Sequence, residues 1–181
     1  LSFDPLIHVL LNGNHPVGED EISLFDKARQ IIETTKDFPK VKSLTISGYL
    51  FGNSGSSIVQ ELAFSLSAAV EYFHRLTDLE LSVSDISNKM RFIFSIGSNY
   101  FFEIAKLRAA RMLWARVVNE FRPSDMDSCK MNIHCVTSAY NKTLYDPYVN
   151  MLRTTTEAMA ATLGGTDSLE VLPFDFPSGK T

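Results

Sequence analysis

Six basic side chains near the middle of the chain form its most evident concentration of charge: Lys89, Arg91, Lys106, Arg108, Arg111 and Arg116. Gathered on one surface, they would bind a phosphate or carboxylate group of a substrate. Helical side chains three or four residues apart also pair with carboxylates such as Glu103, which makes solvated or ion-paired helix positions the alternative. The sequence leaves both interpretations open.

A glycine-rich run, Gly48-Tyr-Leu-Phe-Gly-Asn-Ser-Gly55, is the second candidate. It follows a predicted strand and precedes a predicted helix, so it could hold a phosphate at the helix N-terminus. The chain contains no Gly-x-Gly-x-x-Gly, P-loop, Gly-x-Ser-x-Gly or Cys-x-x-Cys motif. The run by itself therefore does not identify a ligand.

Metal chemistry has little support in the sequence. His134 and Cys135 are adjacent in a predicted strand, where neighbouring side chains point to opposite faces and cannot grip one ion. Cys129 and Cys135 are the two cysteines of the chain. Two cysteines do not make a disulfide framework, so we expect free thiols in a reducing compartment and no metal site.

The composition excludes several classes of partner. The 181 residues are 45% hydrophobic and 21% charged, as in an ordinary globular domain, and the net charge of -4 argues against nucleic acid. No window holds the roughly 20 apolar residues of a membrane span. The start, Leu1-Ser-Phe-Asp-Pro5, does not resemble a signal peptide. We expect an intracellular protein with neither a nucleic-acid nor a membrane partner.

Strands alternate with helices along the chain. Apolar periodicity and turn residues predict strands at 41–47, 90–96, 131–136 and 168–172, and helices at 19–36, 58–75, 99–121 and 149–163. A turn-rich loop is expected at 12–18. This alternation is typical of parallel βαβ units with right-handed crossovers.

Three segments carry a family resemblance: the helical run Tyr100–Val118, the tetrapeptide Tyr145-Asp-Pro-Tyr148, and residues 154–169. With these segments in the same order and at near-identical spacing, residues 43–172 resemble the substrate-binding barrel of the adenosylcobalamin-dependent methylmalonyl-coenzyme A mutase family. The resemblance implies an α/β fold of the parallel (β/α)₈ TIM-barrel type. Because a complete barrel takes roughly 250 residues, we expect about its C-terminal half.

The predicted organisation is therefore one partial barrel domain spanning residues 1–181. It divides into an opening segment and loop at 1–18, βα units at 19–172 and the start of a linker at 173–181. The cobalamin domain of the family, marked by an Asp-x-His-x-x-Gly run, is not found in this sequence. We expect no metal or cofactor on this chain.

The chain departs from the catalytic pattern at the end of its first predicted strand. In catalytic members, a histidine over the substrate thioester follows the strand that ends at Tyr49, whereas here Leu50 follows. Leucine has neither a donor nor an acceptor for a carbonyl. The family resemblance aligns Lys89 with an arginine and Arg91 with a serine. Tyr49, Lys89 and Arg91 are thus expected to be vestigial substrate-binding positions.

Two further motifs depart from the family pattern. His134 keeps the histidine of a His-Cys-Gln-Thr-Ser run, but Val136 replaces its glutamine, and Asp167 replaces the glutamine of Gly-Gly-Thr-Gln-Ser-Leu. We count His134, Val136 and Asp167 as vestigial binding positions as well. For His134 a structural role, held by backbone hydrogen bonds, is the alternative.

Together these losses resemble the small, non-catalytic subunit of the heterodimeric bacterial mutases. The resemblance implies a cytoplasmic component of an isomerase of propionate metabolism that is inactive alone and supports a large catalytic subunit carrying adenosylcobalamin. The alternative is a divergent catalytic acyl-coenzyme A mutase chain with altered substrate preference. No catalytic residue is assigned to this chain.

Half a barrel also makes predictions about exposed surface. Inner faces near Ile46, Ile93 and Ile133 should be uncovered, which favours self-association of the chain. If the interior has been abandoned as a substrate channel, bulky side chains should fill it. The candidates are Leu50, Phe51, Phe92 and Val136.

Overall fold

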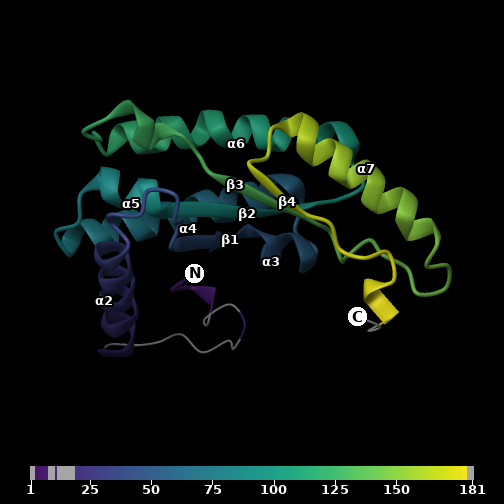
Figure 1. Ribbon diagram of the computed structural model, residues 1–181, viewed down its shortest axis with the longest axis horizontal. Helices are drawn as coiled ribbons and strands as arrows, with labels where there is room; N and C mark the ends of the chain where they lie inside the picture. Colours follow the sequence, from purple (N-terminus) through teal and green to yellow (C-terminus); the bar gives the residue numbers. More distant parts are fainter. Residues whose placement is uncertain (1–2, 8–10, 12–18, 179–181) are drawn as a thin grey trace.

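Four parallel strands form one sheet in the computed structural model, which describes residues 3–7, 11 and 19–178 (Figure 1). The strands are β1 (Leu44–Ser47), β2 (Met90–Ile96), β3 (Ile133–Thr137) and β4 (Ser168–Glu170), and they lie in the order β1-β2-β3-β4. Phe3 adds an isolated parallel bridge to Leu44 at the free side of β1. The α/β class and the parallel pairing predicted from the sequence are confirmed.

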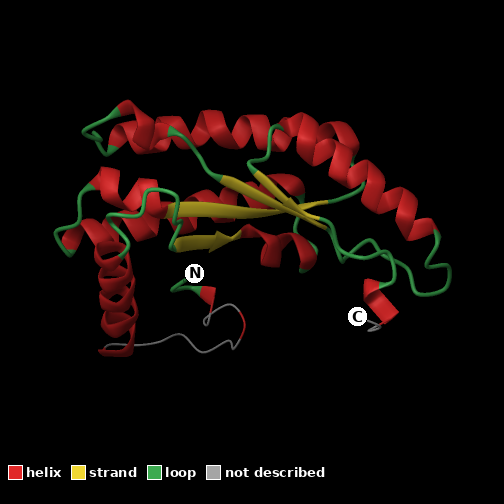
Figure 2. Ribbon diagram, viewed as in Figure 1, coloured by secondary structure: helices red, strands yellow, loops and turns green. Residues whose placement is uncertain are grey.

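Helices connect the strands, and Figure 2 shows α6 and α7 running along the same side of the sheet. The helices are α2 (Glu19–Thr34), α3 (Gly48–Asn53), α4 (Ile58–Asp78), α5 (Val83–Lys89), α6 (Tyr100–Glu120) and α7 (Val149–Gly164), with 3₁₀ turns η1 (Met126–Cys129) and η2 (Phe176–Ser178). The four predicted helices are confirmed to within a few residues at each end. Helix α3 was not predicted, because its glycine-rich sequence is typical of a loop. The loop expected at 12–18 lies outside the described residues.

Two local signals fix helix ends. The Ser57 hydroxyl accepts the Gln60 backbone N–H at 3.2 Å while the Gln60 side chain accepts the Ser57 N–H at 2.9 Å, which closes a capping box at the start of α4. Gly165 ends α7 with φ +86, a left-handed conformation that glycine adopts at little cost. None of the helices in the described ranges is both long enough and apolar enough to cross a membrane.

The hydrophobic core lies between the sheet and the helices. Alternate side chains of the strands are buried in it, together with Phe73 from α4, Trp114 from α6 and Ala160 from α7. Phe92 and Phe73 contact the Trp114 ring, with centroids 4.8 and 5.5 Å away. The opposite face of the sheet is polar and partly open. It carries Arg91, Ile93, His134, Ser168 and Glu170.

This arrangement corrects two expectations about the inner face. The register places Ile46 beside Phe92 and Phe92 beside Ile133, so all three side chains share one face. That face is the helix-covered one, where each of them is buried. The expectations that Ile46 and Ile133 are uncovered, and that Phe92 fills the interior of a barrel, are therefore wrong. Ile93, on the other face, is only partly buried, as expected.

A buried aspartate ties the start of the described chain to the sheet. Asp4 Oδ2 accepts the Ser47 N–H at 2.9 Å, and Oδ1 accepts the Leu6 N–H and the Tyr72 hydroxyl proton. Burial, together with the neighbouring Asp4 carboxylate, raises the pKa of Tyr72, so the phenol stays protonated and keeps donating. Asp4 thus links β1 to α4 at the C-terminal end of the strand.

Candidate functional site

A pocket of about 460 Å³ opens where β2 and β3 end. Gly97 and Ser98 follow β2 in its lining, Ser138 and Tyr140 follow β3, and Glu61 of α4 forms part of its floor. Enzymes built on parallel α/β sheets place their sites at this edge, because the loops after the strands converge there. The pocket is therefore the candidate functional site.

The floor of the pocket forms because β1 is shorter than β2. The register ends at Ser47 beside Ile93, and the chain then turns into α3. Ser95 and Gly97 consequently have no strand partner on that side, although buried backbone groups must be paired. Side chains from the helices supply the missing partners.

Two carboxylates and one ammonium group supply these partners. Glu61 Oε1 accepts the Ser95 N–H at 2.7 Å and the Ser95 hydroxyl at 3.0 Å, and Glu103 Oε1 accepts the Gly97 N–H at 2.9 Å. The Lys106 ammonium donates to the Ser95 carbonyl at 2.6 Å and pairs with Glu61 Oε2 and Glu103 Oε2, each at 2.7 Å. We call Glu61, Glu103 and Lys106 the buried ion cluster.

The protonation states of this cluster follow from burial and charge. Burial raises the pKa of Glu61, against the opposing effect of Lys106. Burial alone would lower the pKa of Lys106, but Glu61 and Glu103 outweigh it and hold that pKa above its ordinary value. The cluster thus contains a firmly charged ammonium between two carboxyl groups.

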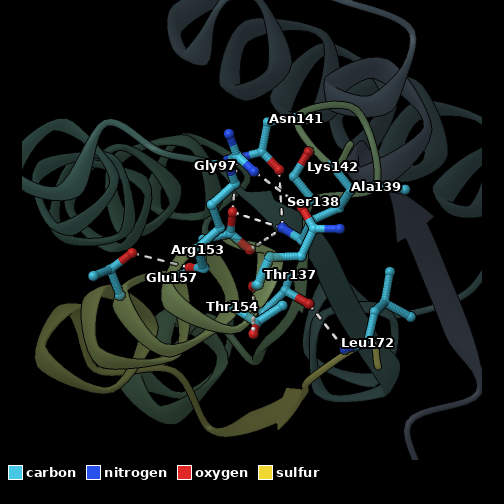
Figure 3. Close-up of polar contacts among 12 residues, drawn as sticks. Gly97, Thr137, Ser138, Ala139, Asn141, Lys142, Arg153, Thr154, Glu157 and Leu172 are labelled. Atoms are coloured by element: carbon cyan, nitrogen blue, oxygen red, sulfur yellow. Dashed lines mark hydrogen bonds and ion pairs between the residues drawn. The ribbon is translucent and has the colours of Figure 1, made fainter. Parts of the chain in front are cut away.

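A second buried pair supports the loop after β3. Lys142 Nζ lies 2.6 Å from Glu157 Oε2 of α7, and Asn141 donates to Glu157 Oε1 at 2.7 Å (Figure 3). Asn53 of α3 holds the other side of the loop by accepting the Ala139 N–H at 3.1 Å. The first part of the loop is therefore held by both α3 and α7, and this pair is balanced in charge.

Tyr49 and Leu50 lie in the first turn of α3, directly after β1. The Tyr49 hydroxyl is hydrogen-bonded to Asn53, while burial raises its pKa. The Leu50 side chain is only partly buried, and Phe51 beside it packs on Phe64 with centroids 5.3 Å apart. The position that the family resemblance aligns with a catalytic histidine is thus occupied by an alkyl group at the sheet edge.

His134 and Val136 lie on the polar face of β3. His134 Nδ1 is 2.8 Å from the Ser168 hydroxyl, and its Nε2 is 3.8 Å from Glu170 Oε2. These are side-chain contacts, whereas the structural alternative for His134 named backbone hydrogen bonds. Val136 is buried on the same face. The Glu170 carboxylate also contributes to raising the pKa of Tyr49, which places Tyr49 near Glu170. Tyr49, His134 and Val136 therefore belong to one region of the molecule.

Lys89, Arg91 and Asp167 lie at the N-terminal ends of β2 and β4. The Lys89 ammonium donates to the carbonyls of Thr35 and Phe38, just beyond the end of α2. Arg91 donates to Asn132 Oδ1 at 2.9 Å. Asp167 accepts the Ile133 N–H at 2.7 Å and pairs with Arg111 at 3.2 Å. The structure does not bring these three to the pocket.

Sequence reasoning missed the burial of the ion cluster. It placed Lys106 and Glu103 on a helix as solvated or ion-paired side chains; the pairing is present, but both are buried. A signal was available, because Glu103, Leu107, Ala110 and Trp114 follow one another at helical spacing and share the buried stripe of α6. Glu61 was not singled out in the sequence at all.

Both histidines of the described ranges contact other side chains. His74 packs its ring edge-on against Phe121, with centroids 5.3 Å apart, and His134 is engaged with Ser168. His8 and His15 lie outside the described residues. Within the described ranges no three His, Cys, Asp or Glu side chains gather so as to hold a metal ion. We therefore assign no cobalt ligand to this part of the chain.

Comparison of the sequence with known proteins shows the family of the chain. The family model for methylmalonyl-CoA mutase matches residues 4–179. The chain is 47% identical over 146 residues to a methylmalonyl-CoA mutase of Rhizobium meliloti (strain 1021), covering 80% of this chain and 20% of that protein. It is 40% identical over 143 residues to the human mitochondrial enzyme, covering 78% of the chain and 19% of the relative.

A relative named as a subunit matches over a longer stretch. The methylmalonyl-CoA mutase small subunit of Porphyromonas gingivalis is 36% identical over 176 residues, covering 97% of this chain and 28% of that protein. The chain thus spans less than a third of the length of these curated relatives. It belongs to the methylmalonyl-CoA mutase family.

Proposed function

We propose that this chain is part of the small, non-catalytic subunit of an adenosylcobalamin-dependent methylmalonyl-CoA mutase. The large subunit would then interconvert methylmalonyl-CoA and succinyl-CoA in propionate metabolism, and this subunit would support it in the bacterial cytoplasm. One observation carries the proposal. Leu50 occupies the position directly after β1 at which a thioester carbonyl would need a hydrogen-bond donor.

Two candidate donors do not compensate for Leu50. Lys89 and Arg91, which align with polar residues of the catalytic pattern, lie toward the other end of β2, where each has a protein acceptor. Electrostatic stabilisation depends on donors aimed at the reacting oxygen, and these donors are directed elsewhere.

The proposed fold is a (β/α)₈ barrel of which this chain forms about the C-terminal half. The sequential order β1-β2-β3-β4 without reversal supports it, because a doubly wound sheet reverses its order at a switch point. The polar face with Arg91, His134 and Glu170 would then line the interior. The cofactor would bind to the partner subunit, since the described histidines are engaged elsewhere.

A divergent catalytic acyl-CoA mutase chain is the second candidate. It is favoured by the partly open polar face, where Tyr49, His134 and Glu170 lie in one region, and by the 47% identity to a relative named simply as a mutase. Leu50 argues against it, because a change of acyl group does not remove the need for a donor over the thioester.

The test is purification of the tagged chain from cells of its source, followed by measurement of bound corrinoid. We expect a larger mutase chain to co-purify and the corrin absorbance to follow that larger chain when the two are separated. Isolated chain that retains corrinoid, or that turns over methylmalonyl-CoA with added adenosylcobalamin, would contradict the proposal and support the catalytic alternative.

A further inference from the structure

The pocket at the C-terminal edge has a rim of a different character from its floor. Three large side chains of the rim are exposed although apolar or aromatic: Val59 at 76%, Phe102 at 71% and Tyr140 at 69%. They come from the first turns of α4 and α6 and from the loop after β3. Exposed apolar groups around a cavity mark a contact surface more often than isolated ones do.

The floor of the pocket has more carboxyl groups than ammonium groups. Glu61 and Glu103 contribute two carboxylates, and Lys106 contributes the one ammonium group paired with them. All three donors of Lys106 are used within the cluster. The nearby Lys142–Glu157 pair is balanced and offers no spare cation. Both side chains lie in the first turns of their helices, the ends at which the macrodipole is positive.

A buried hydroxyl group in the same lining also lacks a partner. Ser56 Oγ is shielded from solvent and has no hydrogen-bond partner among the described residues. Buried polar groups are normally hydrogen-bonded, so an unpaired hydroxyl beside a cavity indicates a missing polar partner. Because a hydroxyl can both donate and accept hydrogen bonds, a polar group beside it would suit this part of the pocket better than an apolar one.

We propose that the pocket receives a lysine side chain of a partner polypeptide. The four-carbon stem would lie against Val59, Phe102 and Tyr140, and the ammonium would lie over the carboxylate floor, beside Ser56. An ammonium suits this site better than a guanidinium, because it is compact and needs no planar pair of free acceptors. A pocket of about 460 Å³ is within the roughly 300–1,000 Å³ of ligand sites.

The inference deepens the proposed function, since a subunit partner would supply the lysine, but its first test needs only this chain. The chain is titrated with n-butylammonium chloride at constant ionic strength, and binding is followed by NMR shifts of the residues around the pocket. Butan-1-ol is the neutral control for the stem, and n-propylguanidinium is the control for arginine. We expect n-butylammonium to bind more tightly than either.

Two variants test the two parts of the pocket. Glu103→Gln removes the surplus charge yet keeps an oxygen for the Gly97 N–H, and it should weaken n-butylammonium binding about tenfold or more, as expected for a hydrogen bond to a charged group. Phe102→Ala removes an exposed rim side chain, so folding should be unaffected while binding weakens. Glu71→Gln, an exposed carboxylate on α4 paired with Arg75, is the matched control and should change nothing.

A further test uses the complex of this chain with its co-purified partner. Acetylation of the partner's lysines should abolish its association with this chain, and Phe102→Ala should weaken it. The inference is overturned if butan-1-ol or n-propylguanidinium binds as tightly as n-butylammonium, or if Glu103→Gln leaves binding unchanged. If a large subunit co-purifies but the chain does not bind n-butylammonium, the lysine inference fails and the proposed function stands.

Discussion

Buried or partly buried charged side chains pair with backbone groups at both ends of the strands, with opposite signs at the two ends. At the N-terminal edge, Lys89 and Arg111 donate to backbone carbonyls at or just beyond the ends of α2 and α7. At the C-terminal edge, Glu61 and Glu103 accept backbone N–H groups of β2 from the first turns of α4 and α6. Each sign matches the helix dipole that a βαβ unit places at that edge. Charges at the N-terminal edge are therefore committed to the fold, whereas those at the C-terminal edge border a pocket.

The largest effect is expected from Lys106→Met. The substitution leaves two buried carboxylates without their cation and the Ser95 carbonyl without its donor. It should lower the free energy of unfolding by about 3–5 kcal/mol, measured by urea denaturation. Adding Glu61→Gln and Glu103→Gln should recover part of this loss, because the uncompensated charges are then removed.

The stabilisation that the Lys106 ammonium provides should be lost at high pH. Neighbouring carboxylates raise the pKa of Lys106 above its ordinary 10.5 in the folded chain. The Lys106 ammonium therefore stabilises the fold fully below the ordinary lysine pKa. That stabilisation is lost as the pH rises through the raised pKa of the folded chain. Denaturation curves recorded up to alkaline pH should show the gap between the parent chain and Lys106→Met closing there.

Lys89→Met sharpens the comparison at the other edge. The variant removes the ammonium group that donates to two carbonyls, but it leaves no buried carboxylate without its cation. We expect a loss of about 1–3 kcal/mol by the same measurement, with n-butylammonium binding at the pocket unchanged. A loss as large as that of Lys106→Met, or a change in pocket binding, would contradict the division between the two edges.

The sequence predicted the elements better than the site. Periodic stripes such as Leu107, Ala110 and Trp114, and stop signals such as Gly165, locate helices because they act locally. Faces of the sheet were assigned less well, because Ile46, Phe92 and Ile133 share a face only through the register between strands. The ion cluster was missed for a related reason. It exists because β1 ends before β2, a long-range property that no single segment encodes.

Leu50→Ala is expected to have a smaller effect. Leu50 was expected to be one of the bulky side chains that fill a closed interior, but it is only partly buried.

 Truncation to alanine removes only a partial apolar contact. It should therefore lower the free energy of unfolding by about 1–2 kcal/mol, less than the loss expected for a core leucine. Thermal or urea unfolding of the variant measures it. A loss well above this range would show that Leu50 is packed in a closed interior.

The smallest effect concerns the two thiols. Burial raises the pKa of Cys135 to about 11 from an ordinary 9.0, whereas Cys129 is partly exposed in η1. At pH 8 the folded chain should therefore show one reactive thiol towards an aromatic disulfide reagent, and Cys129→Ser should remove it. Unfolding in urea should expose the second thiol. Rapid reaction of both in the folded chain would contradict the burial of Cys135.

The most direct test of the central claim is mutase turnover by the complex of this chain with its partner, compared between the parent and Leu50→His. If catalysis belongs to the partner, restoring a histidine at this position should leave kcat and KM for methylmalonyl-CoA unchanged, with the complex still assembled. A clear change in kcat, in either direction, would show that substrate reacts over β1 of this chain and would contradict the non-catalytic role.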